Sequence, residues 1–279
     1  MPLTSILIPC WNALELTRVS LARLLRDTTR PYELILVDNG SRDGTASWLG
    51  RWARSARRRL KGPRRILILS NAANRGYAAA MNQALGRARG ECLLFGNADA
   101  APTPGWLEAM QEALARGGRV GGVSPCANTP AARDRGWSAP PWYDDLPGLD
   151  RFAAAAALAP RARAFIPAPG FVPGFWFLTS RRVLDRVGVF DERFFPGGFE
   201  DWDLQWRMRR DGYAVGFAGR AYVHHVWFGC AARNGLSEKR LYGKTRLARF
   251  LALRPDAAGL PFHILVPGEQ PAARPAARP

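Results

Sequence analysis

Seven side chains in the sequence combine acidic and imidazole groups in a way that could do chemistry. They are Asp38, Asp99, Glu200, Asp201, Asp203, His224 and His225. Such a set suits an enzyme that handles a nucleoside diphosphate. Carboxylates accept hydrogen bonds from a base and a ribose, and a carboxylate with an imidazole is an acceptable ligand pair for a divalent cation that neutralises the diphosphate. A carboxylate at a helix start is kept ionised by the helix dipole and can serve as a general base.

Two of these carboxylates follow apolar runs that are typical of strands. Residues 91–95 predict a short buried strand, so Asp99 lies just past its C-terminal end, and Asp38 follows residues 33–37 in the same way. In open α/β sheets this edge is where ligands bind. A plainer alternative stands beside each assignment, because Asp is common in turns and an acid at a helix start can simply cap the helix.

Alternating apolar patterns predict the elements that position these groups. We expect strands at 5–9, 33–37, 66–69, 91–95 and 120–124, and helices at 13–27, 43–52, 77–89 and 104–116. A chain that alternates in this way forms an α/β fold with a mostly parallel sheet and right-handed crossovers.

The alternation stops between residues 127 and 169, a long irregular stretch of the kind that is usually functional or mobile. Residues 153–158 are compatible with a helical turn inside it. Beyond it we expect strands at 171–179, 213–217 and 221–225, and helices at 181–187, 199–210 and 237–253. The tail at 254–279 is rich in Pro, Ala and Arg and is expected to be extended and poorly ordered.

Composition narrows the class of protein. The chain has 279 residues, of which 47% are hydrophobic, which is enough for a substantial core. It lacks both the ~20-residue apolar run of a membrane span and an N-terminal signal pattern, so we expect a cytoplasmic protein. The four cysteines are far apart and form no CxxC pair, which disfavours a zinc site or a disulfide framework.

A net charge of +17 indicates anionic partners, and residues 51–65 hold eight basic residues and no acid. The general Arg and Ala richness of the chain is the alternative explanation. The basic residues are not interleaved with aromatic residues in a binding motif, so no nucleic acid is expected as a partner. Peripheral contact with anionic lipid at the inner face of a membrane stays open.

Seven segments, in order, resemble the inverting, nucleotide-sugar-dependent glycosyltransferases of family 2, which have the GT-A fold. The segments are SILIPCWN at 5–12, ELILVDNGSRDGT at 33–45, NRGYAAAMNQAL at 74–85, FGNADA at 95–100, PGFWFLTSRRVLDRVGVFDERFF at 173–195, FEDWDLQWRMRRDGY at 199–213 and YVHH at 222–225. A nicotinamide oxidoreductase is disfavoured because no GxGxxG follows the first strand. A sugar nucleotidyltransferase would need a glycine-rich phosphate loop near the N-terminus, and the sequence has none.

The resemblance implies a nucleotide and metal site. The residues implied around the base and ribose are Pro9, Asn12, Asp38, Asn74 and Arg75. Asn97-Ala98-Asp99 takes the place of the DXD motif, which implies Asp99 as a ligand of Mn²⁺ or Mg²⁺ and makes Asn97 and Ala98 lesser nucleotide contacts. His224 is preferred over His225 as the second ligand. Val226 departs from the glycine-rich continuation that is usual in the family, and so leaves that choice open.

The resemblance also implies a catalytic half. Asp201 matches the base of the ED motif, with Glu200 as its competitor. The residues implied on the acceptor side are Gly174, Phe175 and Trp176, to which Trp142 in the irregular stretch is added as a stacking surface. Residues 1–126 and 127–253 would then be the nucleotide-sugar and acceptor halves of one domain.

The reaction so implied is a single displacement with inversion, in which Asp201 takes the proton of the acceptor hydroxyl. The donor would be a UDP-, dTDP- or GDP-sugar that carries a hexose or deoxyhexose. The acceptor would be a glycan, a lipid-linked molecule or a small molecule, in cell-envelope polysaccharide synthesis or other glycoconjugate or natural-product glycosylation. The alternative is a basic α/β protein that binds nucleic acid or anionic membrane without transferase activity.

Overall fold

The computed structural model describes residues 2–57, 63–116, 118–127, 163–226, 230, 234–236 and 244–259. Several features discussed above lie outside these residues. They are the irregular stretch at 128–162, with Trp142 and the helical turn expected at 153–158, the centre of the basic stretch at 58–62, the first part (237–243) of the helix expected at 237–253, and the tail from residue 260 onward.

The first part of the chain forms four parallel strands in the order β3-β2-β1-β4. The elements are β1 (Thr4–Cys10), α1 (Leu14–Asp27), β2 (Tyr32–Asn39), α2 (Thr45–Arg57), β3 (Ile66–Asn71), α3 (Tyr77–Leu85) and β4 (Cys92–Gly96). β1, β2 and β4 read as nearly continuous apolar runs because helices cover both of their faces. The register pairs Cys10 with Asp38 and Asp38 with Ser70, so the carboxyl ends of β1, β2 and β3 meet at one edge.

The second part adds a mixed set of strands. Its elements are β5 (Ala100–Pro102), α4 (Trp106–Ala115), β6 (Val120–Cys126), β7 (Phe165–Pro167), β8 (Trp176–Ser180), α7 (Arg181–Val187), η2 (Glu192–Phe194), α8 (Glu200–Arg210), β9 (Ala214–His225), α11 (Lys244–Leu253) and η3 (Pro255–Gly259). β8 inserts between β4 and β6 and is antiparallel to both, whereas β6 and β9 are parallel. The expected α/β fold is thus confirmed, and its antiparallel strands are concentrated in this part.

Three details differ from the sequence-based expectation. The strand expected at 171–179 begins only at Trp176, because residues 171–175, with Pro173 and Gly174, lie next to α8 instead of in the sheet. The strands expected at 213–217 and 221–225 are one strand, β9, which pairs first with β6 and then with β5. The short strands β5 and β7 were not predicted, because three residues are too few to show a period.

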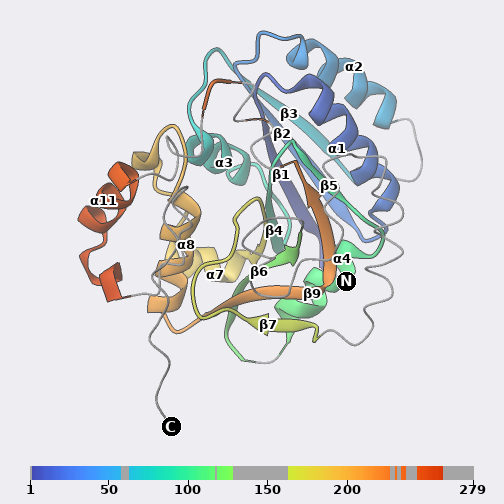
Figure 1. The fold of residues 1–279 in the computed structure, drawn as a ribbon. Coiled ribbons are helices and arrows are strands. Elements are labelled where there is room, and N and C mark those ends of the chain that lie inside the picture. The colour runs from blue at the N-terminus through green and yellow to red at the C-terminus, as the bar shows by residue number, and fades with distance from the viewer. Residues whose placement is uncertain are drawn as a thin grey trace.

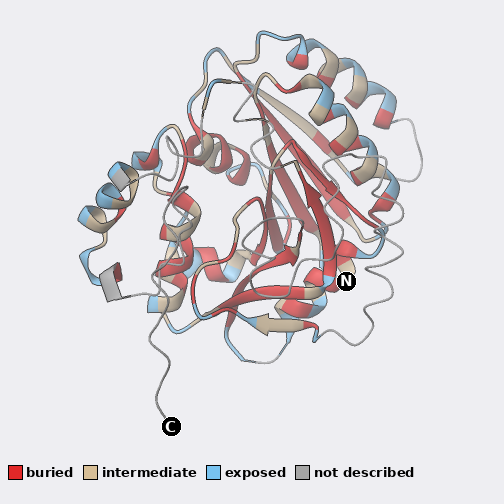
Figure 2. Ribbon diagram, in the orientation of Figure 1, coloured by how far each residue is buried: buried red, intermediate tan, exposed pale blue. Residues whose placement is uncertain are grey.

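The helices cover both faces of the sheet (Figure 1). α1, α2 and α4 pack on one face and α3, α7 and α8 on the other. β1 alternates accordingly: Ile6 and Ile8 belong to the first core cluster and Leu7 to the second. Figure 2 shows the buried residues concentrated in the strands between these layers.

The C-terminal helix α11 packs outside this three-layer arrangement, beside α8 (Figure 1). Phe250 of α11 is fully buried in a small cluster with Phe194, Phe199 and Trp206. Within the described ranges, no helix combines the length and apolarity that crossing a membrane requires.

Candidate active site

Asp99 is held at the end of β4 by the pairing of β5 with the last residues of β9. Ala100 lies opposite His225 in this antiparallel pair, which brings His225 Nε2 to 3.2 Å from Asp99 Oδ1. The backbone N–H of Cys230 donates a hydrogen bond of 2.8 Å to Asp99 Oδ2. Asp99 Oδ1 thus contacts the last residue of β9, and Oδ2 binds the backbone of Cys230 beyond that strand.

The two histidines differ in their position relative to Asp99. Neighbouring residues of a strand point to opposite faces, so only one of them can face Asp99, and that residue is His225. The His225 ring also stacks on Phe175, with ring centroids 4.3 Å apart and an interplanar angle of 8°. His224, which the sequence-based prediction preferred, is buried on the opposite side of β9. The geometry therefore favours His225.

Asp99 has the charge and the neighbour that a cation site needs. Burial alone would raise its pKa, but the His225 charge and hydrogen bonds from His225 and Cys230 bring the pKa below the ordinary value. In the described part of the chain, no group of three or more His, Cys, Asp or Glu residues could hold an ion. The Asp99–His225 pair nevertheless fits a divalent cation whose remaining ligands are phosphate oxygens and water.

The ends of β1 and β2 form a second polar region on the same edge of the sheet. Asp38 is 3% exposed, and its Oδ1 has no hydrogen-bond partner among the described residues. Burial raises the pKa of Asp38, and hydrogen bonds from Ser41 partly offset that rise. Pro9, the penultimate residue of β1, pairs in register with Val37. Asp38 Oδ1 is thus a buried acceptor to which a bound ligand can donate a hydrogen bond.

Asn12, by contrast, is engaged within the protein. Its Oδ1 accepts from the backbone N–H of Arg42 at 2.7 Å, and its Nδ2 donates to Asn234 Oδ1 at 2.9 Å. Asn234 in turn donates to the Trp11 carbonyl at 3.0 Å. Asn12 therefore joins the loops after β1 and β2 to the segment after β9, and sequence reasoning did not find Asn234.

A network of amide side chains supports Asn74 and Arg75. Sequence reasoning did not find this network either. Asn39 Nδ2 donates to Asn74 Oδ1 at 2.9 Å, and Asn39 Oδ1 accepts from the Arg75 backbone N–H at 3.1 Å. Asn71 Nδ2 donates to Asn39 Oδ1 at 3.0 Å. Asn39 directly follows Asp38, so its position in the sequence was the available clue. The network fixes the turn before α3 while the Arg75 side chain stays exposed.

The start of α8 carries Asp201 toward the same region. Gly197, Gly198 and Phe199 all have positive φ, which makes a sharp turn into the helix. Asp201 Oδ2 accepts a 3.0 Å hydrogen bond from the backbone N–H of Gly174. A Cβ added at Gly174 would lie 2.4 Å from that oxygen, so only glycine allows this approach.

Gly174 and Phe175 connect the two charged parts of the site. Gly174 binds Asp201, and the next residue, Phe175, stacks on His225, which contacts Asp99. The structure thus brings five predicted or competing site residues into one contiguous set. They are Asp99, Gly174, Phe175, Asp201 and His225.

Glu200 and Asp201 share a setting that weakens their acidity. Burial is the main cause for both, and it raises the pKa of Asp201 to about 6 although backbone N–H groups of Trp202 and Gly174 oppose the rise. The pKa of Glu200 rises further, to about 8, because the charge of Asp201 adds to burial. Near neutral pH Asp201 is therefore the ionised member and Glu200 the protonated one.

Two predicted residues are buried rather than presented to a ligand. Trp176, assigned to the acceptor side from the sequence, is 0% exposed and packs edge-on against Trp106 at 5.4 Å. Its role is corrected to support of the core beneath the site. Ala98 is also buried, whereas Asn97 is partly exposed, with Nδ2 3.5 Å from His225 Nε2.

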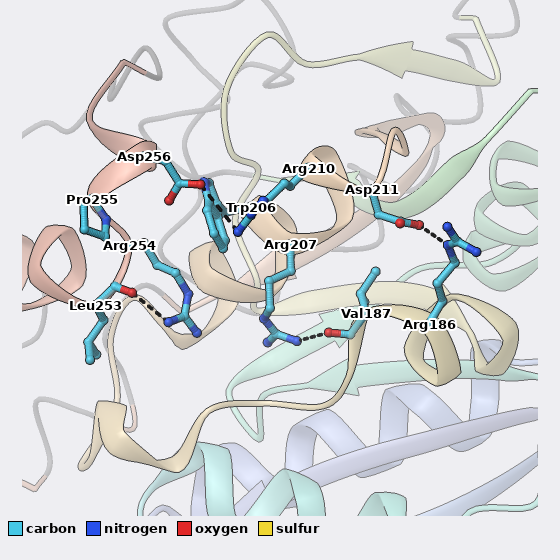
Figure 3. A pocket seen from close by; sticks show the side chains of 10 residues that line it. All are labelled: Arg186, Val187, Trp206, Arg207, Arg210, Asp211, Leu253, Arg254, Pro255 and Asp256. Carbon is cyan, nitrogen blue, oxygen red and sulfur yellow. Dashed lines mark hydrogen bonds and ion pairs between the residues drawn. The ribbon is translucent and has the colours of Figure 1, made fainter.

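A pocket of about 590 Å³ lies elsewhere, on another side of α8 (Figure 3). Its lining residues are Arg186, Val187, Trp206, Arg207, Arg210, Asp211, Leu253, Arg254, Pro255 and Asp256. The arginines drawn there contact neighbouring carboxylates and carbonyls, as in the pairs Arg186–Asp211 and Arg210–Asp256. None of the predicted site residues lines this pocket.

Comparison with known proteins identifies the family. Residues 5–187 match the family described as Glycosyl transferase family 2. The chain is 30% identical over 230 residues to the N-acetylglucosaminyl-diphospho-decaprenol L-rhamnosyltransferase of Mycobacterium tuberculosis, covering 74% of this chain and 70% of that protein. It is 26% identical over 228 residues to glycosyltransferase AglE of Haloferax volcanii, covering 78% and 65%.

Solved structures share the fold. The mannosyltransferase PcManGT from Pyrobaculum calidifontis, in complex with GDP-Man and Mn²⁺, superposes with a TM-score of 0.61 at 23% identity, covering 81% of this chain and 57% of that one. GalNAc-T7 with UDP, GalNAc and Mn²⁺ gives 0.60 at 13% identity, covering 94% and 52%. The chain thus spans little more than half the length of these solved chains. By the family match, and with a fold that these structures share, the chain belongs to glycosyltransferase family 2 and is a glycosyltransferase of the GT-A fold.

Proposed function

We propose that the protein transfers a hexosyl or deoxyhexosyl group from a nucleoside-diphosphate sugar to an acceptor hydroxyl, with inversion at the anomeric carbon. One observation carries the proposal: the ionised Asp201 and the Asp99–His225 pair lie on either side of the Gly174–Phe175 segment. A base and a cation site on two sides of a short segment suit the two ends of one displacement reaction.

In this mechanism Asp201 accepts the proton of the acceptor hydroxyl while that oxygen bonds to the anomeric carbon. The bond from this carbon to the diphosphate oxygen breaks on the opposite face, and the nucleoside diphosphate leaves. Asp99 and His225 would hold Mn²⁺ or Mg²⁺, which supplies neutralisation of the charge on the leaving diphosphate. Gly174 donates its N–H to Asp201 Oδ2 and Trp202 donates its backbone N–H to Oδ1, and these two hydrogen bonds orient the carboxylate.

The nucleoside would be bound along the edge formed by β1, β2 and β3. The buried Oδ1 of Asp38 suits a ribose or base donor, because a buried acceptor without a partner is costly until one arrives. Asn74 and Arg75, fixed by the Asn39 network, would line the same region, with Pro9 beside it. Asn12 contributes by holding the surrounding loops together.

For the acceptor, we propose a lipid-linked molecule in cell-envelope synthesis, since the mycobacterial relative is named for a diphospho-decaprenol acceptor. Peripheral binding at the inner face of the membrane is part of this proposal. Arg51, Arg54 and Arg57 on α2 are exposed and could contact anionic lipid. Sedimentation with anionic vesicles at low salt tests it, and absence of binding would contradict it.

A melting-shift screen tests the donor assignment. UDP, GDP and dTDP are each added with Mn²⁺, Mg²⁺ or EDTA, and one nucleotide at about 100 times its Kd should stabilise the fold by about 2.7 kcal/mol only when metal is present. Asp99→Ala is the matched variant and should lose the metal-dependent part of the shift. No shift with any nucleotide, together with salt-dependent DNA binding, would favour the alternative of a basic binding protein.

A further inference from the structure

Two buried polar groups near Asp201 have no role in the mechanism above. The Tyr77 hydroxyl and Glu200 Oε2 are both buried, and neither has a hydrogen-bond partner among the described residues. Buried polar groups are nearly always hydrogen-bonded, and leaving one unpaired costs about 1–3 kcal/mol. A ligand that supplies the missing partners would remove that cost.

Both side chains lie beside the same short piece of backbone, Pro196–Gly197. Tyr77 is the first residue of α3, and its backbone N–H donates to the Pro196 carbonyl at 3.1 Å. A Cβ added at the next residue, Gly197, would lie 3.7 Å from Tyr77 Cβ and 4.0 Å from Glu200 Oε1. The Tyr77 ring is held edge-on by Phe190, with centroids 5.9 Å apart. The Tyr77 side chain is thus positioned by packing, with Glu200 next to it at Gly197.

Charges from both parts of the site act on the Tyr77 hydroxyl. Burial raises the pKa of Tyr77 well above its ordinary value, and the charges of Glu200, Asp201 and Asp99 raise it further. The hydroxyl is therefore within reach of the fields of both the base and the cation ligand, and it stays protonated. Glu200 is protonated near neutral pH as well, so the pair offers two neutral groups that can both donate and accept hydrogen bonds.

We propose that Tyr77 Oη and Glu200 Oε2 hydrogen-bond to hydroxyls of the sugar that is transferred and so select the donor sugar. This inference rests on the proposed function. The transferred sugar must lie between the diphosphate at Asp99 and the acceptor oxygen at Asp201. Glu200 directly precedes Asp201 at the start of α8, and Tyr77 lies beside Glu200 at Gly197. A site built to hydrogen-bond a hydroxyl discriminates strongly against an analogue that lacks it, because its buried groups are then left unpaired.

A buried hydroxyl without a partner is not sufficient evidence by itself. Tyr32, the first residue of β2, has such a hydroxyl at the opposite end of the strand from Asp38. Burial raises the pKa of Tyr32, but no carboxylate contributes to that rise. What distinguishes Tyr77 is its position beside Glu200 and close to Asp201 and Asp99. Tyr32→Phe is therefore a matched control that removes the same atom away from the site.

The test compares binding of sugar nucleotides with binding of the free nucleotides. Titration calorimetry in Mn²⁺ would measure UDP-glucose, GDP-mannose and dTDP-rhamnose, and then UDP, GDP and dTDP, with the parent, Tyr77→Phe, Glu200→Leu, Glu200→Gln and Tyr32→Phe. Tyr77→Phe and Glu200→Leu should weaken the parent's preferred sugar nucleotide about tenfold or more and leave its free nucleotide within about twofold. Glu200→Gln, which keeps a neutral donor and acceptor, should restore most of the loss.

The outcomes separate this inference from the proposed function. A parent that binds no nucleotide overturns both. Equal weakening of the sugar nucleotide and the free nucleotide, or no weakening in Tyr77→Phe, overturns the sugar contact alone. Unchanged donor binding with a raised KM for the acceptor would move the pair to the acceptor and also contradict the proposal. Should Glu200→Leu fail to fold, Tyr77→Phe against Tyr32→Phe decides the question.

Discussion

The two sides of α8 carry acidic residues in opposite electrostatic settings. Asp201 and Asp203 are two positions apart, about 200° around the helix axis, so they face different regions. On the site-facing side, neither Glu200 nor Asp201 forms an ion pair within the described ranges. On the other side, fully buried Asp203 contacts Arg207 Nη2 at 2.8 Å and Arg254 Nε at 2.6 Å.

This difference shows how one helix can serve both structure and chemistry. The acids facing the site have raised pKa values because they are buried, and the charge of Arg246 offsets the rise at Glu200 only in part. Just past the C-terminus of α8, hydrogen bonding and charge from Arg186 lower the pKa of Asp211. Raised pKa values in a polar region beside the proposed cation site are typical of functional groups, whereas paired acids are typical of packing. The arginine-lined pocket of Figure 3 belongs to the packing side.

Breaking the paired side should have the largest effect on stability. Asp203→Asn leaves Arg207 and Arg254 without their shared carboxylate, so the free energy of unfolding in urea should fall by about 3–5 kcal/mol. Asp256→Asn is the matched control, since its 3.5 Å pair with Arg210 is exposed, and it should change stability by less than ~1 kcal/mol. A loss below ~1 kcal/mol in Asp203→Asn would contradict the assignment of this side to structure.

The reaction proposed for Asp201 needs a cation at the leaving diphosphate, and His225 is a proposed ligand of that cation. His225→Asn should weaken Mn²⁺-dependent binding of the nucleoside diphosphate at least ~10-fold, the lower end of what loss of even an outer-shell partner costs. Binding without metal should not change. His224→Asn, its neighbour on the other face of β9, is the control. Loss of metal dependence in His224→Asn but not in His225→Asn would reverse the assignment.

Replacing an unpaired buried acid should raise the free energy of unfolding, whereas replacing a paired one should lower it. The folded-state pKa of Glu200 is above its unfolded value, so the folded protein binds more protons and loses stability as pH rises from about 4.5 to about 8. Glu200→Gln removes that loss and should stabilise the protein by at least ~1 kcal/mol at pH 8, with little change at pH 5. Denaturant unfolding at both pH values measures it, and destabilisation at pH 8 would refute the unpaired setting of Glu200.

Sequence patterns predicted the parallel strands in the first part of the chain better than the mixed strands in the second part. The strands that end at Asp38 and Asp99 were found because buried parallel strands are uniform apolar runs, and the family and α/β fold are confirmed. The choice of His225 could not be made in advance, because it depends on the register of β9 against β5. Trp176 was misplaced for a similar reason: only the insertion of β8 between β4 and β6 buries it. Long-range pairing leaves no local period in the sequence.

The pH dependence of turnover in the parent and in Asp201→Asn tests the central claim most directly. Asp201 must be ionised to accept a proton, so parental kcat/KM, which reports the free enzyme, should fall on the acid side with an apparent pKa of about 6 instead of the ordinary carboxylate range. Asp201→Asn should lower kcat at pH 8 by at least ~10²-fold, lose this acid limb and bind the sugar nucleotide within about threefold of the parent. Near-parental turnover in Asp201→Asn, together with its loss in Glu200→Gln, would contradict the account and make Glu200 the base.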